Sequence, residues 1–276
     1  MAKKDSVKGL PQAPSFALFK NICVCCEQSG KQMNKEHFYP QWLLKRTKTQ
    51  KDLFTTPYGK IPADQFTVPL CEECNSQLGR ELELPVSKIF DSIESGHGFN
   101  DYEAELLIRW MWKLNGIFYW SICNYNWRYG FVSLKEHVLS PIPPPRNRLS
   151  IAVSLIQDPD EEFGCAPVGL DVFSFYSNIY AAGVFSTLCI AVFYSEFGYL
   201  FEDAGWTVYK LSNCPNVLNP EKRVIPTVGF QTGREAITYI KKNLGNDSEI
   251  YKAHEEKAYL AKQQLLLFFD ARESHK

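Results

Sequence analysis

The chain carries two closely spaced cysteine pairs, Cys23-Val24-Cys25-Cys26 and Cys71-Glu72-Glu73-Cys74, separated by residues 27–70. Two cysteines with two residues between them form a turn whose thiolates can both reach one tetrahedral ion, and two such turns complete a four-cysteine zinc site. We therefore expect a structural Zn²⁺ on Cys23, Cys26, Cys71 and Cys74, with Cys25 outside the set. The alternative is a group of buried free thiols.

Residues 27–70 form too long an insert for a bare zinc ribbon, so we expect secondary structure within them. They include Asn34-Lys35-Glu36-His37-Phe38-Tyr39-Pro40-Gln41-Trp42-Leu43-Leu44. Glu36 and His37 place a carboxylate beside an imidazole, a pair suited to proton transfer and metal binding. Neighbouring side chains of a regular strand point to opposite faces, so the two can share a site only where the strand ends or bends. Without a motif around it, such a pair is more often a surface ion pair.

Asn75, Gly79 and Glu83 follow the second cysteine pair in Cys74-Asn75-Ser76-Gln77-Leu78-Gly79-Arg80-Glu81-Leu82-Glu83. Asparagine is a favoured helix N-cap, so Asn75 has a structural reading beside any metal-binding one. Eight residues of α-helix separate Asn75 from Glu83 by about 12 Å along the axis and roughly 80° around it. We therefore expect Glu83 to be structural or to contact a metal ligand without binding the metal itself.

The order CxxC, Glu-His-x-x-Pro and CxxC-Asn-x-x-x-Gly resembles the HNH endonuclease family, whose fold is a ββα-metal (treble-clef) unit. More narrowly, the chain is similar to uncharacterised bacterial HNH-like proteins with a Glu-His-x-x-Pro-x-Trp-Leu segment, matched by Glu36 to Leu43. These proteins also share a Trp-x-x-Lys helix, matched by Trp110 to Lys113. The resemblance covers roughly residues 20–120.

The resemblance implies a role for each matched residue. His37 matches the general base that takes a proton from the attacking water, and Glu36 and Asn75 match the ligands of one catalytic Mg²⁺ or similar divalent cation. Two positions depart from the family pattern. Many members have His or Lys where this chain has Gly79, and the asparagine that orients the base is missing, which leaves Gln65 or Thr67 for that role.

The charge distribution fits a nucleic-acid partner only near the N-terminus. The whole chain has 30 Lys and Arg against 31 Asp and Glu, a net charge of −1, but residues 1–60 hold 11 basic and 4 acidic residues. Phosphate backbones attract such cations without sequence readout. We expect DNA as the partner, although only the family favours it over RNA, and we interpret Phe38, Tyr39 and Trp42 as packing residues. Cations surround the Glu36-His37 segment at Lys31, Lys35, Lys45, Arg46, Lys48, Lys51 and Lys60.

Beyond the cysteine region, a helical stripe predicts a long helix from Asp101 to Trp127. Strands are expected at 151–156, 172–176 and 184–194, a loop at 214–231, and helices at 232–244 and 248–270. The uncharged run 172–195 is read as two buried strands joined by a turn, so we expect no membrane span. The charged stretch Met1-Ala2-Lys3-Lys4-Asp5 leads into no apolar core, so we expect no signal peptide, and nine cysteines without a disulfide pattern suit a reducing cytoplasm.

We therefore predict an α+β protein with four parts. These are a leader (1–17), an HNH nuclease domain (18–98), a connecting helix (99–140) and an α+β C-terminal domain of unknown role (141–276), divided at the proline run 141–145. The predicted function is a metal-dependent endonuclease that cuts DNA, in a setting such as bacterial defence. We expect the C-terminal region to bind a protein or a second copy of the chain. The alternative is a catalytically inactive, zinc-stabilised module that binds nucleic acid or protein.

Overall fold

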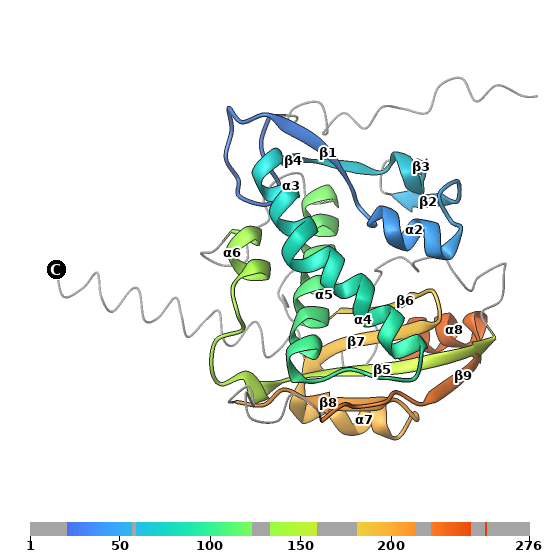
Figure 1. Cartoon of the computed structure of the whole chain (residues 1–276). Coiled ribbons are helices and arrows are strands. Elements are labelled where there is room, and N and C mark those ends of the chain that lie inside the picture. Colours follow the sequence, from blue (N-terminus) through green and yellow to red (C-terminus); the bar gives the residue numbers. More distant parts are fainter. Residues whose placement is uncertain are drawn as a thin grey trace, which may run out of the picture.

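The computed structural model describes residues 21–56, 59–122, 133–158, 181–213, 222–243 and 252, and within these it is mixed α+β (Figure 1). The expected leader and most of the expected helix 248–270 lie outside the described residues. The N-terminal half contains β1 (Met33–His37), α2 (Gln41–Thr47), β2 (Leu53–Thr56), β3 (Gly59–Pro62), η1 (Ala63–Gln65), β4 (Thr67–Cys71), α3 (Glu72–Leu78), η2 (Gly79–Glu83), α4 (Leu84–Glu94) and α5 (Asp101–Ile122). The rest contains α6 (Leu134–Leu139), η3 (Arg146–Arg148), β5 (Leu149–Asp158), β6 (Ala181–Phe185), β7 (Leu188–Tyr194), η4 (Ser195–Phe197), α7 (Gly198–Glu202), β8 (Thr207–Lys210), β9 (Val228–Thr232) and α8 (Gly233–Asn243).

Strands β1 and β4 form an antiparallel pair that leads directly into helix α3. Met33 lies opposite Cys71 at one end of the pair, and His37 lies opposite Thr67 at the other. The insert between the cysteine pairs therefore contains secondary structure, as expected: β1, α2, the β2–β3 pair and β4. Strand β1 ends at His37 and the next two residues bend, while Glu36 and His37 themselves still pair in register with Val68 and Thr67.

The helical segment from Glu72 to Glu94 contains one π-turn, η2, between α3 and α4. A π-turn closes with i→i+5 hydrogen bonds and so holds one residue more than an α-turn. In rotation about the axis, the eight residues from Asn75 to Glu83 then act as about seven, which reduces the angle between them from roughly 80° to roughly 20°. The π-turn thus turns Glu83 back towards the face that carries Asn75.

Helix α5 confirms the long helix that the apolar stripe predicted. Leu106, Leu107, Trp110, Met111, Leu114 and Ile117 are all buried. The described part of the helix ends at Ile122, so the expected continuation to Trp127 lies outside the described residues. Helix α5 packs beside α4, and the two lie along one face of the larger sheet (Figure 1).

The larger sheet has five strands, with β6, β7, β5 and β8 antiparallel in that order and β9 parallel to β5. Alternate residues of its strands enter two different cores, because successive side chains of a strand point to opposite faces. Ile151, Phe185 and Ile190 join the core that contains α4 and α5. Ala152 and Cys189 join the core that contains α7 and α8. The sheet is therefore buried on both sides.

Three expectations for this region have different outcomes. The strand at 151–156 and the helix at 232–244 are confirmed as β5 and α8. The single strand expected at 184–194 is wrong, because a turn at residues 186–187, with Ser186 left-handed at φ 60°, divides it into β6 and β7. The loop expected at 214–231 is wrong at its end, where the structure has β9. The apolar pattern of β9 is too short to predict a strand, and its pairing with β5 stabilises it. The strand at 172–176 lies outside the described residues.

The proline run at 141–145 packs against α5. The Ile142 amide donates to Glu105 Oε1 at 2.9 Å, and Arg146 Nη2 donates to Glu105 Oε2 at 2.6 Å. One hydrophobic cluster includes Cys23, α5 and the sheet as far as Leu211. In the part of the chain that the structure describes, no helix is both long and apolar enough to cross a membrane.

Candidate functional site

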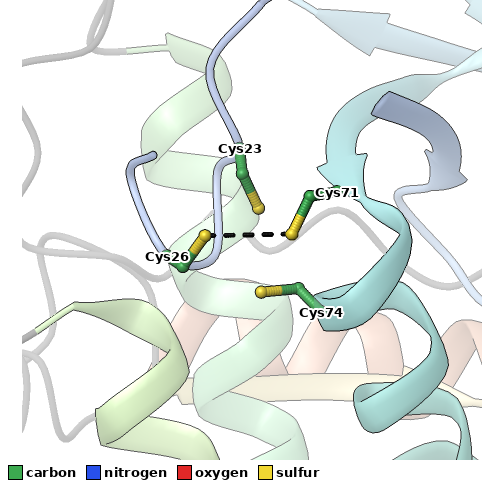
Figure 2. Close-up of side chains that lie close together, drawn as sticks. All are labelled: Cys23, Cys26, Cys71 and Cys74. Atoms are coloured by element: carbon green, nitrogen blue, oxygen red, sulfur yellow. Dashed lines mark hydrogen bonds between the residues drawn. The ribbon is translucent and has the colours of Figure 1, made fainter. Parts of the chain in front are cut away.

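The four predicted cysteines come together at the junction of the N-terminal loop, β4 and α3 (Figure 2). Their Sγ atoms all lie within 4.8 Å of one another, and Cys26 Sγ lies 3.9 Å from Cys71 Sγ. Four Zn–S bonds of about 2.3 Å in a tetrahedron place the sulfurs roughly 3.8 Å apart. The group can therefore hold a metal ion such as zinc, and Cys25 lies outside it, as expected.

Backbone hydrogen bonds shape the first cysteine turn. The Cys23 amide donates to Gln28 O at 3.0 Å, and the Glu27 amide donates to Cys23 O at 2.8 Å. Glu27 takes the left-handed conformation, with φ 59°, which closes the turn. The Val24 amide donates to Pro69 O at 3.0 Å and so ties the turn to β4. The second pair needs no such turn, because Cys71 is the N-cap of α3 and Cys74 lies one turn inside it.

Burial and mutual hydrogen bonds raise the pKa of thiols in this cluster. A hydrogen bond with Cys74, together with burial, raises the pKa of the Cys23 thiol to about 12. Burial is also the largest cause of the raised pKa of Cys26. Four thiolates without a cation would repel one another, so ionisation of the whole set requires a positive ion among them.

Two lysines supply positive charge beside the cysteine group. Lys31 Nζ and Lys135 Nζ donate to the two oxygens of Glu73 at 2.9 and 2.7 Å. These hydrogen bonds, that from Lys135 first, lower the pKa of Glu73 to about 2. The Lys135 amide also donates to Cys25 O at 2.8 Å, so helix α6 is attached to the first cysteine turn.

The structure sets Glu36, His37 and Asn75 on one ββα element. Glu36 and His37 are the last two residues of β1, and Asn75 lies within α3, which packs against β1 and β4. Asn75 is therefore not the helix N-cap, because α3 begins at Glu72 and Cys71 takes the cap position. Of the two residues considered for orienting His37, Gln65 is exposed, whereas Thr67 is the direct cross-strand neighbour of His37.

Glu36 has a partner that the sequence analysis did not assign. Its Oε1 atom accepts a hydrogen bond from Lys113 Nζ at 3.2 Å, and the same ammonium donates to Glu83 Oε1 at 2.7 Å. Burial lowers the pKa of Lys113, but the charges of Glu83 and Glu36 outweigh burial and raise it above its ordinary value. The signal was a lysine inside the apolar stripe of α5, since a buried ammonium needs acidic partners.

Three of the seven cations near this segment are paired within the chain. Lys31 pairs with Glu73, Arg46 with Asp91 and Glu94, and Lys51 with Asp64. Lys35, Lys45 and Lys48 are exposed, and no ion pair joins any of them to a described acidic residue.

The aromatic residues of the segment are confirmed as packing residues. Phe38 and Tyr39 are buried, and Phe38 stacks on Phe66 with ring centroids 4.8 Å apart. Trp42 contacts the Phe90 ring at 5.2 Å between centroids and donates from Nε1 to Glu83 Oε2 at 2.9 Å. Their ring faces are used inside the protein.

No family model, curated protein or solved structure matches this chain significantly.

Proposed function

We propose that this protein is a metal-dependent endonuclease of the HNH type that hydrolyses phosphodiester bonds of DNA. One observation carries the proposal: a β–β–α element, fastened at one corner by four convergent cysteines, has Glu36 and His37 at the end of its first strand and Asn75 in its helix. A treble-clef description of this element, with Zn²⁺ on the cysteines, belongs to the same proposal.

In the proposed reaction, His37 takes a proton from a water molecule that attacks the phosphorus. An imidazole suits this step because its ordinary pKa is close to neutral. Thr67, opposite His37 in the ladder, is the residue proposed to orient the ring. Glu36 and Asn75 offer one carboxylate and one amide oxygen, a donor set that suits Mg²⁺ with waters completing its shell. When bound, such an ion stabilises the negative charge on the leaving oxygen.

The substrate surface is proposed to involve the exposed lysines that flank β1 and α2. Lys35 lies on β1 itself, and Lys45 and Lys48 lie at the end of α2. Their charge would attract phosphates of either nucleic acid without reading the bases. DNA is proposed over RNA on the family resemblance alone.

Plasmid nicking with Mn²⁺ or Mg²⁺ tests the proposal. We expect the wild type to relax supercoiled plasmid and His37→Ala to do so about 10²- to 10⁴-fold more slowly, which is the usual contribution of a general base. His97→Ala is the matched control, because His97 is exposed in the loop after α4. Equal nicking by all three proteins would mean contamination and leave no support for His37 as the base.

The second candidate is a zinc-stabilised module that binds nucleic acid or protein without cutting it. It is favoured by the pairing of Glu36 with Lys113 and by Gly79, which offers no side chain as a ligand. Retention of DNA by a wild type that leaves the plasmid supercoiled would support it.

A further inference from the structure

Lys113 is a fully buried cation in the middle of helix α5. Its side chain has 0% exposure, and its ammonium contacts two carboxylates, those of Glu83 at 2.7 Å and Glu36 at 3.2 Å. A buried ammonium is costly unless it is paired with good geometry. These two contacts therefore fix where both carboxylates lie.

Glu83 is held on both of its oxygens. Lys113 donates to Oε1, while the indole N–H groups of Trp42 and Trp110 donate to Oε2 at 2.9 and 3.2 Å. The π-turn η2 supplies this residue, and α2 and α5 supply the two indoles. Glu83 thus holds the Lys113 ammonium in place, and neither side chain can move without breaking these hydrogen bonds.

Glu36 is the most solvent-exposed of these three charged residues. Its side chain is 17% exposed, compared with 9% for Glu83 and 0% for Lys113. One ammonium and two carboxylates leave one net negative charge, and Glu36, at the end of β1, is where solvent can reach it. A cation beside Glu36 would neutralise that charge, whereas Lys113 itself is too deeply buried to touch a substrate.

We propose that Lys113 is a positioning residue, which Glu83 anchors and which holds the Glu36 carboxylate, at the end of β1, in the orientation that binds a divalent cation. The inference rests on the proposed function in one respect, that Glu36 is a ligand of that cation.

Mn²⁺ binding, measured from the loss of the free-ion electron paramagnetic resonance signal, tests the inference without reference to activity. The test variant is Lys113→Met combined with Glu83→Gln, which removes the buried charges together and keeps an oxygen for the two indoles. We expect it to bind Mn²⁺ at least tenfold more weakly than the wild type, as does Glu36→Gln. Glu105→Gln is the matched control, because Glu105 is a buried, ion-paired acid of the same helix, eight residues earlier. It should leave Mn²⁺ affinity unchanged.

Plasmid nicking by the same proteins separates this inference from the proposed function. We expect the nicking kcat of the double variant to fall while the KM for plasmid stays constant, because Lys113 acts through Glu36 and not on DNA. Wild-type Mn²⁺ affinity in the double variant, with affinity lost in Glu36→Gln, would overturn the inference and leave the nuclease intact. Mn²⁺ binding that depends on Lys113 in a protein that never nicks DNA would keep the inference and reject the nuclease. No Mn²⁺ binding by the wild type would overturn the inference outright.

Glu83→Gln alone keeps the test decisive if the double variant does not fold. It retains the acceptor for both indoles and changes the net charge of the cluster from −1 to zero. We expect at least a threefold loss of Mn²⁺ affinity in a protein with unchanged zinc content. A folded Glu83→Gln protein with wild-type affinity would overturn the inference.

Discussion

His137 shows how one buried ring makes stability depend on pH. It stacks on Trp112 with ring centroids 4.4 Å apart, and burial lowers its pKa to about 4. In the unfolded chain its pKa is close to 6.5, so as the pH falls the unfolded state takes up the proton first. The contribution of the neutral ring is fully present above about pH 6.5 and is lost as the pH falls towards 4. Between pH 7 and 5 we expect this residue to cost roughly 2 kcal/mol of unfolding free energy.

Urea unfolding at pH 7 and pH 5 checks this expectation. The difference between the two pH values should shrink by that amount in His137→Gln, whatever the stability of the variant at pH 7. His97→Gln is the control, because His97 is exposed and bonds through its backbone: its oxygen accepts from Arg223, and its amide donates to Ser92 O at 2.9 Å. An unchanged pH difference in His137→Gln would show that other groups cause the acid sensitivity.

Gly79 is the first residue of the π-turn, and its effect belongs to the helical element. Its backbone is ordinary right-handed helix, at φ −58° and ψ −47°, and an added Cβ would meet no atom within 4 Å. Alanine is favoured over glycine by about 1 kcal/mol inside a helix. We therefore expect Gly79→Ala to raise the unfolding free energy by about 0.5 to 1 kcal/mol, measured by urea unfolding.

Gly183 provides the contrasting case in a strand. A Cβ there would lie 2.7 Å from the buried ring of Phe185, so Gly183→Ala should destabilise by about 1–3 kcal/mol through overpacking. Destabilisation by Gly79→Ala as well would mean that the π-turn itself requires glycine.

The elements that sequence predicts well are those whose pattern is local. The α5 stripe, the β-branched run of β5 and the cysteine spacing each contain their own signal, and all three are confirmed. Strand β9 was missed because its pairing partner, β5, lies far away in the chain. The sequence does not reveal the π-turn, because a single i→i+5 turn leaves no periodicity of its own. The contact between Glu83 and Lys113 depends on this turn and is therefore not predicted either. The sequence motifs contain Glu36 and Lys113 separately, and only the fold pairs them.

At the scale of the molecule, one continuous core joins the cysteine region to the sheet, which argues against the cysteine region as a separate folding unit. Cys23, Trp110 and Phe185 belong to one hydrophobic cluster, and the Trp110 and Phe185 rings lie 5.0 Å apart between centroids. Helix α5 thus packs against both the cysteine region and the sheet. We expect removal of a metal ion held by the four cysteines to destabilise the whole described structure and not only its N-terminal part.

Cys189 reports on this coupling, because it lies in the second core, on the far side of the sheet. Burial raises the pKa of its thiol well above the ordinary value, so it reacts only when the sheet opens. With a chelator present, we expect iodoacetamide to label Cys189 at least tenfold faster, together with the four cysteines of the metal group, as read by peptide mass spectrometry. Elemental analysis should find one zinc per chain before chelation and none after it, and Cys71→Ser should label like the chelated wild type. Full labelling of the four thiols with an unchanged rate at Cys189 would instead show that residues 18–98 open alone, which is the domain division that the sequence predicts.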